Sequence, residues 1–280
     1  MAVIGIDLGT TNSLAGVWQD GKVVLIPNAF GEYLTPSVVS IGKNQEVFVG
    51  SVAKEMLATQ PYDTFREFKR NMGTNFLYGN GRKKYRAEEL SAFVLRRLKE
   101  DAEKFLGEEV TEAVISVPAY FDDNKRNATK NAGRLAGLKV ERLINEPSAV
   151  ALKHHTAEKG AESFIVFDFG GGTLDVSLVE AFDNVVEIQA VAGDNYLGGK
   201  DFNEIIAQDF YEQNQISEAY LTKNEQENVL KEAEAVKKEL TDKNEAERQV
   251  YIKGEAYTLK MTNQSCLLYT SDAADDSLRV

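Results

Sequence analysis

Two short turns rich in glycine and hydroxyl residues constrain the fold of this chain more than any other feature. Each turn follows an apolar run that ends in an aspartate, Asp7 in the first case and Asp168 in the second. Each then enters a segment in which apolar and polar residues alternate, residues 13–18 and residues 174–180. One such turn is typical of an ordinary hairpin. Two of them, near the start of each half, predict duplicated phosphate-binding loops that face each other across a cleft.

The residues around the two turns follow one plan, in which three strands are followed by helices. In the first half we expect strands at 3–6, 13–18, 23–26, 113–117 and 140–144, and helices at 88–105, 122–135 and 146 to about 155. In the second half we expect strands at 163–168, 174–180 and 185–192, helices at 201–212 and 222–240, and a hairpin over 249–261. The repeated plan predicts an α/β fold with two lobes related by duplication.

The helix starts carry specific capping signals. Asp122 is the first residue of the expected helix at 122–135 and is a suitable N-cap residue. Thr222 and Glu225 form a capping box at the start of the charged helix that follows. We expect lobe I at 1–162, with an inserted subdomain at about 37–110. Partial lobe II is expected at 163–264, with an inserted subdomain from about 203.

Composition limits the class of protein. The chain of 280 residues has 32 basic and 44 acidic residues and a net charge of -12, which argues against nucleic-acid or anionic-membrane partners. Its single cysteine, Cys266, cannot form an internal disulfide, so a reducing compartment is expected. No secretion signal follows Met1, and the apolar runs are too short to cross a bilayer. These features predict a cytoplasmic globular protein.

The last residues differ in character from the rest. Residues 265–280 lack periodicity, and residues 271–276 are small and acidic. The hairpin before them calls for further sheet and helices, so we expect an incomplete second lobe with apolar surface left exposed. A non-native or disordered tail is therefore predicted at 265–280.

The two turns contain the groups that bind a triphosphate with magnesium. Such a ligand needs backbone N–H donors, close approach of the backbone, hydroxyls, and carboxylates that hold the hydrated metal. Glycine permits both the close approach and positive φ angles. The first turn offers Gly9, Thr10, Thr11 and Asn12 after Asp7, and the second offers Gly170, Gly171, Gly172 and Thr173 between Asp168 and Asp175.

Five segments in order closely resemble the nucleotide-binding domain of DnaK-type heat-shock chaperones. They are residues 4–13, 117–121, 144–148, 167–175 and 193–199. The resemblance covers residues 3 to about 264 and implies the actin-like, ribonuclease H-like ATPase fold. The segment between Lys69 and Ala113 is short, which resembles the specialised HscC-like branch of the family.

The resemblance implies roles for residues around the phosphates. Asp7 and Asp168 would hold Mg²⁺ through water, and the two turns would bind the phosphates of ATP or ADP, with K⁺ as an optional further cation. Lys69 would reach the γ-phosphate, and Glu146 would lie near the attacking water. Thr173 and Asp175 would lie beside that water.

The resemblance also implies roles farther from the reaction. Gly198 and Gly199 match a further phosphate turn, and Pro118 and Arg126 match a pair that couples nucleotide state to a partner domain. The adenosine-contacting positions are Glu234, Lys237, Lys238 and Thr241. Lys238 replaces the usual arginine, so adenine binding is expected to be weaker. No second glycine-serine-arginine turn for adenosine is found in the sequence.

The residues alone leave other interpretations open for these side chains. Lys69 could be one solvated cation of the basic run 66–70, and Glu146 could simply cap a helix. Arg126 could be a solvated helix cation. Trp18, Tyr120 and Phe121 are expected in the core.

Three functions compete. The resemblance implies slow ATP hydrolysis that drives protein folding through a peptide-binding domain, with a J-domain co-chaperone, a nucleotide-exchange factor and unfolded client proteins as partners. The second is a non-hydrolysing fragment that binds nucleotide weakly or engages only co-chaperones. The third is a sugar kinase of the same superfamily, which the lysine, glutamate and proline-arginine matches argue against.

Overall fold

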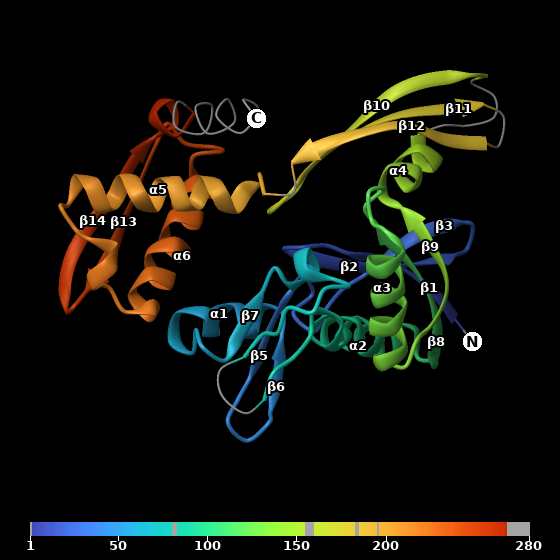
Figure 1. The fold of residues 1–280 in the computed structure, drawn as a ribbon, viewed down its shortest axis with the longest axis horizontal. Coiled ribbons are helices and arrows are strands. Elements are labelled where there is room, and N and C mark those ends of the chain that lie inside the picture. Colours follow the sequence, from blue (N-terminus) through green and yellow to red (C-terminus); the bar gives the residue numbers. More distant parts are fainter. Residues whose placement is uncertain (1, 80–82, 155–159, 183–184, 195, 268–280) are drawn as a thin grey trace. The chain divides into compact units, whose positions relative to one another are not determined.

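The first glycine turn follows β1, a central strand of a six-stranded sheet in the order β3-β2-β1-β8-β9, with β4 also paired to β2 (Figure 1). The strands are β1 (Ala2–Leu8), β2 (Asn12–Gln19), β3 (Lys22–Ile26), β4 (Thr35–Pro36), β8 (Val110–Val117) and β9 (Lys139–Asn145). β1 pairs antiparallel with β2 and parallel with β8, where Ile6 lies opposite Ile115. The parallel pairing places the end of β1 beside the end of β8.

The structure is a computed structural model that describes residues 2–79, 83–154, 160–182, 185–194 and 196–267. Its contacts separate two units. Unit 1 comprises residues 1–54, 62–168 and 175–193, and unit 2 comprises 55–61, 169–174 and 194–280. The units interleave along the chain, and the domain boundaries expected from the sequence stay a prediction.

Two helices cover one face of the six-stranded sheet. They are α2 (Ala87–Leu106) and α3 (Asp123–Leu135), and their apolar side chains share one core with Ile4, Leu8 and Ile115. Asp122 accepts a hydrogen bond from the Lys125 N–H at 2.9 Å, which confirms it as the N-cap of α3. Both predicted helices are therefore present, the first identified from helical periodicity and the second predicted with Asp122 as its N-cap.

Trp18 is not in this core. Along β2, Ser13, Ala15 and Val17 point inward, so Trp18 lies on the opposite face and is 70% exposed. The expectation that Trp18 is a core residue was wrong, because strand alternation decides burial here rather than apolarity.

Residues 38–72 contain several short elements that periodicity did not resolve. This segment contains a sheet in the order β6-β5-β7, with β5 (Val38–Ile41), β6 (Val47–Val49) and β7 (Thr64–Arg66). Helix α1 (Ser51–Thr59) and the 3₁₀ helix η1 (Phe68–Asn71) complete it. Such short elements carry too few residues to show a period.

The second glycine turn joins the first two strands of a three-stranded sheet, β10 (Glu162–Phe169), β11 (Leu174–Phe182) and β12 (Val185–Asp194). Helix α4 (Glu146–His154) covers one face through Ala151, which packs with Val166 and Val179. The predicted end of this helix at about His155 lies outside the described residues. Apolar side chains also remain exposed on this sheet, including Ile165 at 67%.

Residues 199–267 of unit 2 form an α/β cluster. It contains α5 (Gly199–Gln213), the 3₁₀ helix η3 (Glu218–Tyr220), α6 (Lys223–Glu239) and the hairpin of β13 (Glu245–Ile252) and β14 (Glu255–Thr262). Thr222 accepts from the Glu225 N–H, and the Glu225 carboxylate accepts from the Thr222 N–H, so the predicted capping box is present.

Cys266 is buried in the core of this cluster. The predicted tail lies outside the described residues from position 268 onward. No helix in the described ranges is both long enough and apolar enough to span a membrane.

Candidate active site

The first glycine turn is fixed by backbone contacts and by Ser37. A Cβ atom on Gly9 would lie 2.1 Å from the Asn12 carbonyl oxygen, so the turn requires glycine there. The Ser37 hydroxyl donates to the Gly9 carbonyl at 2.8 Å, and the Ser37 N–H donates to the Thr11 carbonyl at 2.8 Å. The predicted turn 9–12 is therefore held rigidly at the end of β1.

Asp7 lies at the same end of β1. Its Oδ1 accepts a hydrogen bond from the Ser116 hydroxyl at 2.8 Å. Ser116 comes from β8, which runs parallel to β1. Because a hydrogen bond to a carboxylate restrains its rotation, Ser116 fixes the direction in which Asp7 presents its second oxygen.

Lys69 and Glu146 form an ion pair inside unit 1. Lys69 Nζ lies 2.9 Å from Glu146 Oε1, and Lys69 is only 7% exposed. Lys69 comes from η1, and Glu146 is the first residue of α4. Burial raises the pKa of the Glu146 carboxyl, and the charge of Lys69 opposes that rise. Lys69 is therefore not the solvated cation that its basic neighbours suggested.

A small cavity lies beside this ion pair. Its volume is about 10 Å³, and it is lined by Pro118, Ala119, Glu146, Pro147, Val166, Asp168, Asp175 and Ser177. A volume of this size accommodates one water molecule. Three carboxylates in its wall could accept hydrogen bonds from that water.

The Asp168 carboxyl is affected by burial and by the charges of nearby residues. The pKa of its carboxyl is raised first by desolvation and then by the nearby charge of Asp7, although the residue as a whole is exposed. Two carboxylates that repel each other in this way favour a bound cation between or beside them. In the described part of the chain, no group of three or more histidine, cysteine or acidic residues could hold a metal ion directly.

Two aromatic residues frame the ion pair. Phe121 is buried, and Lys69 Nζ lies 5.9 Å from the centre of its ring. Burial raises the pKa of the partly buried Tyr120 phenol, and the charges of Asp175 and Glu146 raise it further. The Tyr120 phenol therefore stays protonated near neutral pH and can donate a hydrogen bond.

Arg126 connects the Pro118 turn to β9. Its Nε donates to the Phe121 carbonyl at 2.8 Å, and one terminal nitrogen donates to Asn145 Oδ1 at 2.7 Å. Pro118 lines the cavity, and Asn145 directly precedes Glu146. Arg126 is thus tied into unit 1 rather than being a solvated helix cation.

The second glycine turn lies in unit 2 and is joined to Gly199 by backbone hydrogen bonds. The Gly170 N–H donates to the Thr173 carbonyl at 2.9 Å, and the Gly199 N–H donates to the Gly170 carbonyl at 3.1 Å. A Cβ atom on Gly198 would lie 2.3 Å from the Gly172 nitrogen. The structure therefore brings both predicted glycine segments of unit 2 together.

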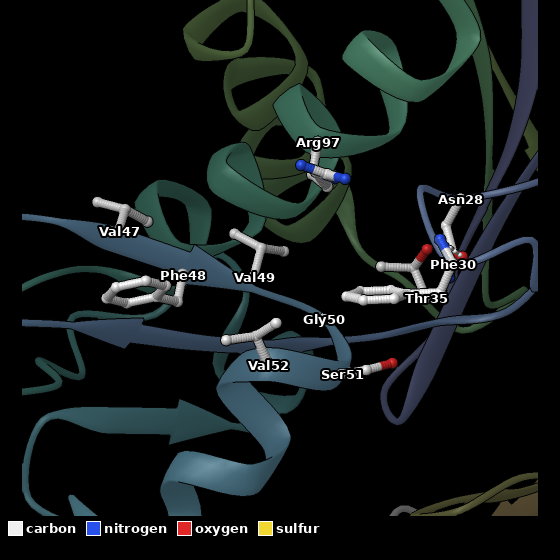
Figure 2. Close-up of a pocket in the computed structure, with 10 residues that line it drawn as sticks. All are labelled: Asn28, Phe30, Thr35, Val47, Phe48, Val49, Gly50, Ser51, Val52 and Arg97. Carbon is white, nitrogen blue, oxygen red and sulfur yellow. Dashed lines mark hydrogen bonds between the residues drawn. The ribbon is translucent and has the colours of Figure 1, made fainter. Parts of the chain in front are cut away.

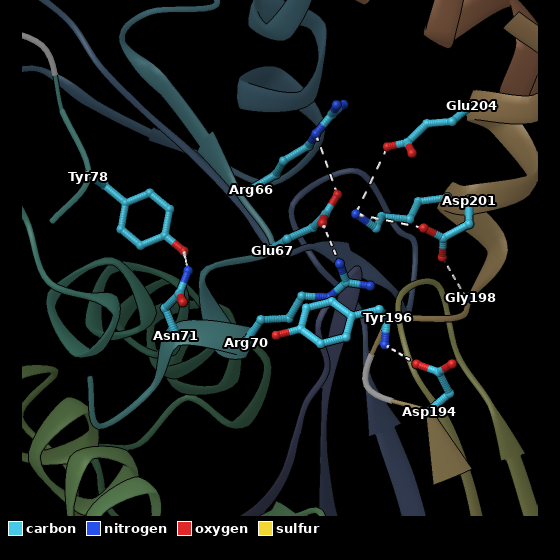
Figure 3. Close-up of polar contacts among 11 residues, drawn as sticks. Arg66, Glu67, Arg70, Asn71, Tyr78, Asp194, Tyr196, Gly198, Asp201 and Glu204 are labelled. Atoms are coloured by element: carbon cyan, nitrogen blue, oxygen red, sulfur yellow. Dashed lines mark hydrogen bonds and ion pairs between the residues drawn. The ribbon is translucent and has the colours of Figure 1, made fainter. Parts of the chain in front are cut away.

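Helix α5 begins at Gly199, within this group of glycines. The Gly198 N–H donates to Asp201 Oδ2 at 2.7 Å (Figure 3). A helix N-terminus presents backbone donors and a positive dipole end, which favour an anion. The Asp201 carboxylate already accepts a hydrogen bond from one of these backbone donors, the Gly198 N–H.

The predicted adenosine residues lie along α6 and just after it. Lys237 Nζ donates to the Gly199 carbonyl, so this side chain reaches the glycine cluster. Lys238 instead pairs with Glu234 at 2.7 Å. The Thr241 N–H donates to the Lys238 carbonyl at 3.2 Å in the turn that ends the helix.

A larger cavity of unit 1 contains none of the predicted site residues (Figure 2). Its volume is about 170 Å³, and it is lined by Asn28, Phe30, Thr35, Val47, Phe48, Val49, Gly50, Ser51, Val52 and Arg97. Arg97 pairs with Asp101 at 3.2 Å. This cavity therefore does not belong to the cluster of Asp7, Lys69 and Glu146.

Sequence reasoning missed Ser37, Ser116 and Asn145. The partners of Ser37 and Ser116 lie 28 and 109 positions away in the chain, so local spacing carries no signal for them. Asn145 lies inside a motif that was recognised, but only the structure shows its contact with Arg126.

The fold and these motifs agree with a comparison against protein families. The family described as Hsp70 protein matches residues 3–79 and 77–264, which is most of the chain. The mixed α/β architecture is that of the actin-like ATPase domain of this family. The chain belongs to the Hsp70 protein family.

Proposed function

We propose that this chain binds ATP with magnesium and hydrolyses it slowly, as the nucleotide-binding domain of an Hsp70-type chaperone. The observation that carries the proposal is the ion pair of the buried Lys69 with the partly buried Glu146, 2.9 Å apart, beside a cavity the size of one water. A cation buried in this way needs a reason, since charges are rarely taken out of water for stability alone.

Each member of the pair has a distinct task in this mechanism. Phosphoryl transfer to water depends on positioning and on stabilising the charge that spreads over the transferred phosphoryl oxygens. Lys69 supplies a fixed cation for that charge. Glu146 orients the attacking water and accepts its hydrogen bond, while Asp175 and Thr173 flank the same water.

The phosphates would be bound by backbone donors of the two glycine turns. Gly9, Thr10, Thr11 and Asn12 supply the first set. The second set comes from Gly170 to Thr173, supported by Gly198 and Gly199. Magnesium, when bound, neutralises phosphate charge, and Asp7 and Asp168 are the carboxylates that would hold it through water.

The residues of unit 1 fit such a cation. Desolvation and then the charge of Asp7 raise the pKa of the Asp168 carboxyl, so the two carboxylates interact, and Ser116 orients Asp7. Glu234, Lys237, Lys238 and Thr241 would contact adenosine. Lys237 is the best supported of these four, because it already reaches the Gly199 carbonyl.

Hsp70 proteins generally work with J-domain proteins and nucleotide-exchange factors, and we propose the same partners here. Pro118 and Arg126 are proposed to couple nucleotide state to the peptide-binding domain that acts on unfolded clients. We assign the chain to the HscC-like branch on the short segment between Lys69 and β8.

Calorimetry and single-turnover hydrolysis on the purified chain test this function. We expect heat of binding for Mg-ATP and slow release of phosphate from a single bound equivalent. Heat without phosphate release would favour the non-hydrolysing fragment. Acceleration by one member of a sugar panel, with phosphate transferred to that sugar, would favour a sugar kinase.

A further inference from the structure

Glu67 has an uncommon backbone conformation two residues before Lys69. Its φ of 58° and ψ of 18° place it in the left-handed region, directly before η1. Such angles are unfavourable for residues with a Cβ atom, and glutamate has no special tolerance for them. Strain of this kind in a native structure points to a constraint imposed by its surroundings.

The other non-glycine residues of this type have local explanations. Among the described residues these are Asp20, Gln45, Gln215 and Lys253, which lie in hairpin turns, in a loop or just after a helix. Tight turns commonly need one left-handed residue. Glu67 instead connects β7 to η1, where no hairpin is formed.

Two arginines hold the Glu67 side chain in place. Glu67 Oε1 lies 3.6 Å from Arg66 Nε, and Glu67 Oε2 lies 3.4 Å from Arg70 NH1 (Figure 3). The Arg70 N–H also donates to the Glu67 carbonyl at 3.2 Å. Both the side chain and the backbone of Glu67 are therefore fixed to the start of η1.

The left-handed residue changes the direction of the chain before the proposed catalytic lysine. Arg66 still pairs with Val38 in the small sheet, whereas Phe68 is 1% exposed and Lys69 is 7% exposed. The Met72 N–H donates to the Lys69 carbonyl at 3.1 Å, which fixes the lysine backbone inside η1. Within three residues the chain passes from a sheet edge to a buried cation.

We propose that the left-handed backbone of Glu67 is the positioning element that directs Lys69 toward Glu146. The role of Lys69 in turnover rests on the proposed function. The effect of Glu67 on the direction of the Lys69 side chain does not rest on it. The ion pairs with Arg66 and Arg70 hold the carboxylate of this strained residue, and the backbone angle sets the direction of the lysine.

Two substitutions separate the backbone angle from the side chain. Glu67→Gly and Glu67→Ala both remove the carboxylate, but only glycine adopts a left-handed angle freely. The matched control is Gln45→Ala, which shortens the side chain of a left-handed residue in a loop outside the site and keeps its backbone penalty. Circular dichroism confirms that each variant is folded.

The main readout is the acetylation rate of Lys69, followed by mass spectrometry. A left-handed penalty on alanine corresponds to a factor of about 5–30 in a conformational equilibrium. We expect Lys69 to be labelled faster by about that factor in Glu67→Ala than in Glu67→Gly, because both variants lack the carboxylate and only alanine keeps the penalty, while Gln45→Ala stays within about twofold of the parent chain. Labelling of Lys99 serves as an internal reference.

Single-turnover hydrolysis gives the functional readout, with the Kd for ATP measured in parallel. We expect slower turnover in Glu67→Ala than in Glu67→Gly, with the Kd unchanged. Equal labelling of Lys69 in the alanine and glycine variants would overturn the inference. If the parent chain shows no hydrolysis, the proposed function fails, and the labelling comparison still decides the role of Glu67.

Discussion

The two phosphate turns are built by different means. In unit 1 the turn is surrounded by side chains, with Ser37 bound to Gly9, Ser116 bound to Asp7, and Lys69 paired with Glu146. In unit 2 glycines pack against glycines, and backbone hydrogen bonds join residues 170, 173 and 199. The conformation of the unit 1 turn therefore depends on side chains of distant residues, whereas that of the unit 2 turn depends on close packing that only glycine permits.

The largest expected effect comes from removing the Lys69 ammonium group in unit 1. Lys69→Ala should lower the single-turnover rate by about 10²–10³, the usual loss when one donor to a developing negative charge is removed. The Kd for Mg-ATP should change little, because the phosphate turns remain. Lys99→Ala is the matched control, since Lys99 forms an ion pair with Glu103 on α2. Equal losses of binding and turnover would contradict the proposed role of Lys69.

The next effect tests the shape of unit 2. Gly198→Ala would place a Cβ atom 2.3 Å from the Gly172 nitrogen, so the backbone must shift at a cost of about 1–3 kcal/mol of stability. Gly42→Ala is the control, because Gly42 lies outside the proposed site and its Cβ would lie at an ordinary 3.7 Å from the Glu46 carbonyl oxygen. We expect weaker nucleotide binding and a lower melting temperature only for Gly198→Ala. Similar behaviour of both variants would show that backbone packing is not what this turn requires.

The same comparison can be made in unit 1. Gly9→Ala would bring a Cβ atom within 2.1 Å of the Asn12 carbonyl oxygen, whereas Gly5→Ala on the preceding strand β1 would meet nothing closer than 3.9 Å. We expect calorimetry to show a loss of ATP affinity for Gly9→Ala alone. Unchanged affinity in Gly9→Ala would remove the first turn from the binding site.

A smaller effect is expected for the residue that orients Asp7. Ser116→Ala removes one hydrogen bond to a carboxylate, worth roughly 1.5–3 kcal/mol at most. We expect the apparent affinity for Mg²⁺ in the ATPase assay to fall about tenfold, with the affinity for metal-free ATP unchanged. An unaltered magnesium dependence would contradict the assignment of Asp7 to the metal.

The smallest effect is a dependence on pH. Burial raises the pKa of Glu146 above the usual value of 4.5, so this carboxyl takes up a proton at a higher pH than an exposed glutamate does. Its folded-state pKa exceeds its unfolded-state pKa, so protonation on acidification favours the folded state and breaks the charge pair with Lys69. Turnover should therefore decline at a pH where circular dichroism still shows folded protein. Coincident loss of activity and fold would contradict this.

The sequence predicted the regular elements and the two turns well. Strand alternation and helical periodicity located the meander of β1, β2 and β3, and the capping signals at Asp122 and Thr222 are present as expected. These features are local, since each depends on residues within a few positions of one another. The adenosine and allosteric roles stay predictions.

The features that the sequence did not predict depend on distant contacts or on conformation. The resemblance implied a role for Lys69 at the γ-phosphate, but the residues alone left open a solvated cation. Burial beside a core that includes Phe121 and an ion pair across 77 positions decide that the side chain is not solvated. The left-handed angle of Glu67 has no signal in residue type, because glutamate rarely adopts it. Trp18 is exposed because its position in the strand outweighs its apolarity.

The central claim is that Lys69 and Glu146 act as one unit in hydrolysis. A double-mutant cycle of single-turnover rates tests it, using Lys69→Ala, Glu146→Ala and the double variant on folded protein with saturating Mg-ATP. If the pair acts as a unit, the double variant should be no slower than the slower single variant, since groups that act together show strongly non-additive losses. Losses that multiply in the double variant would contradict the claim.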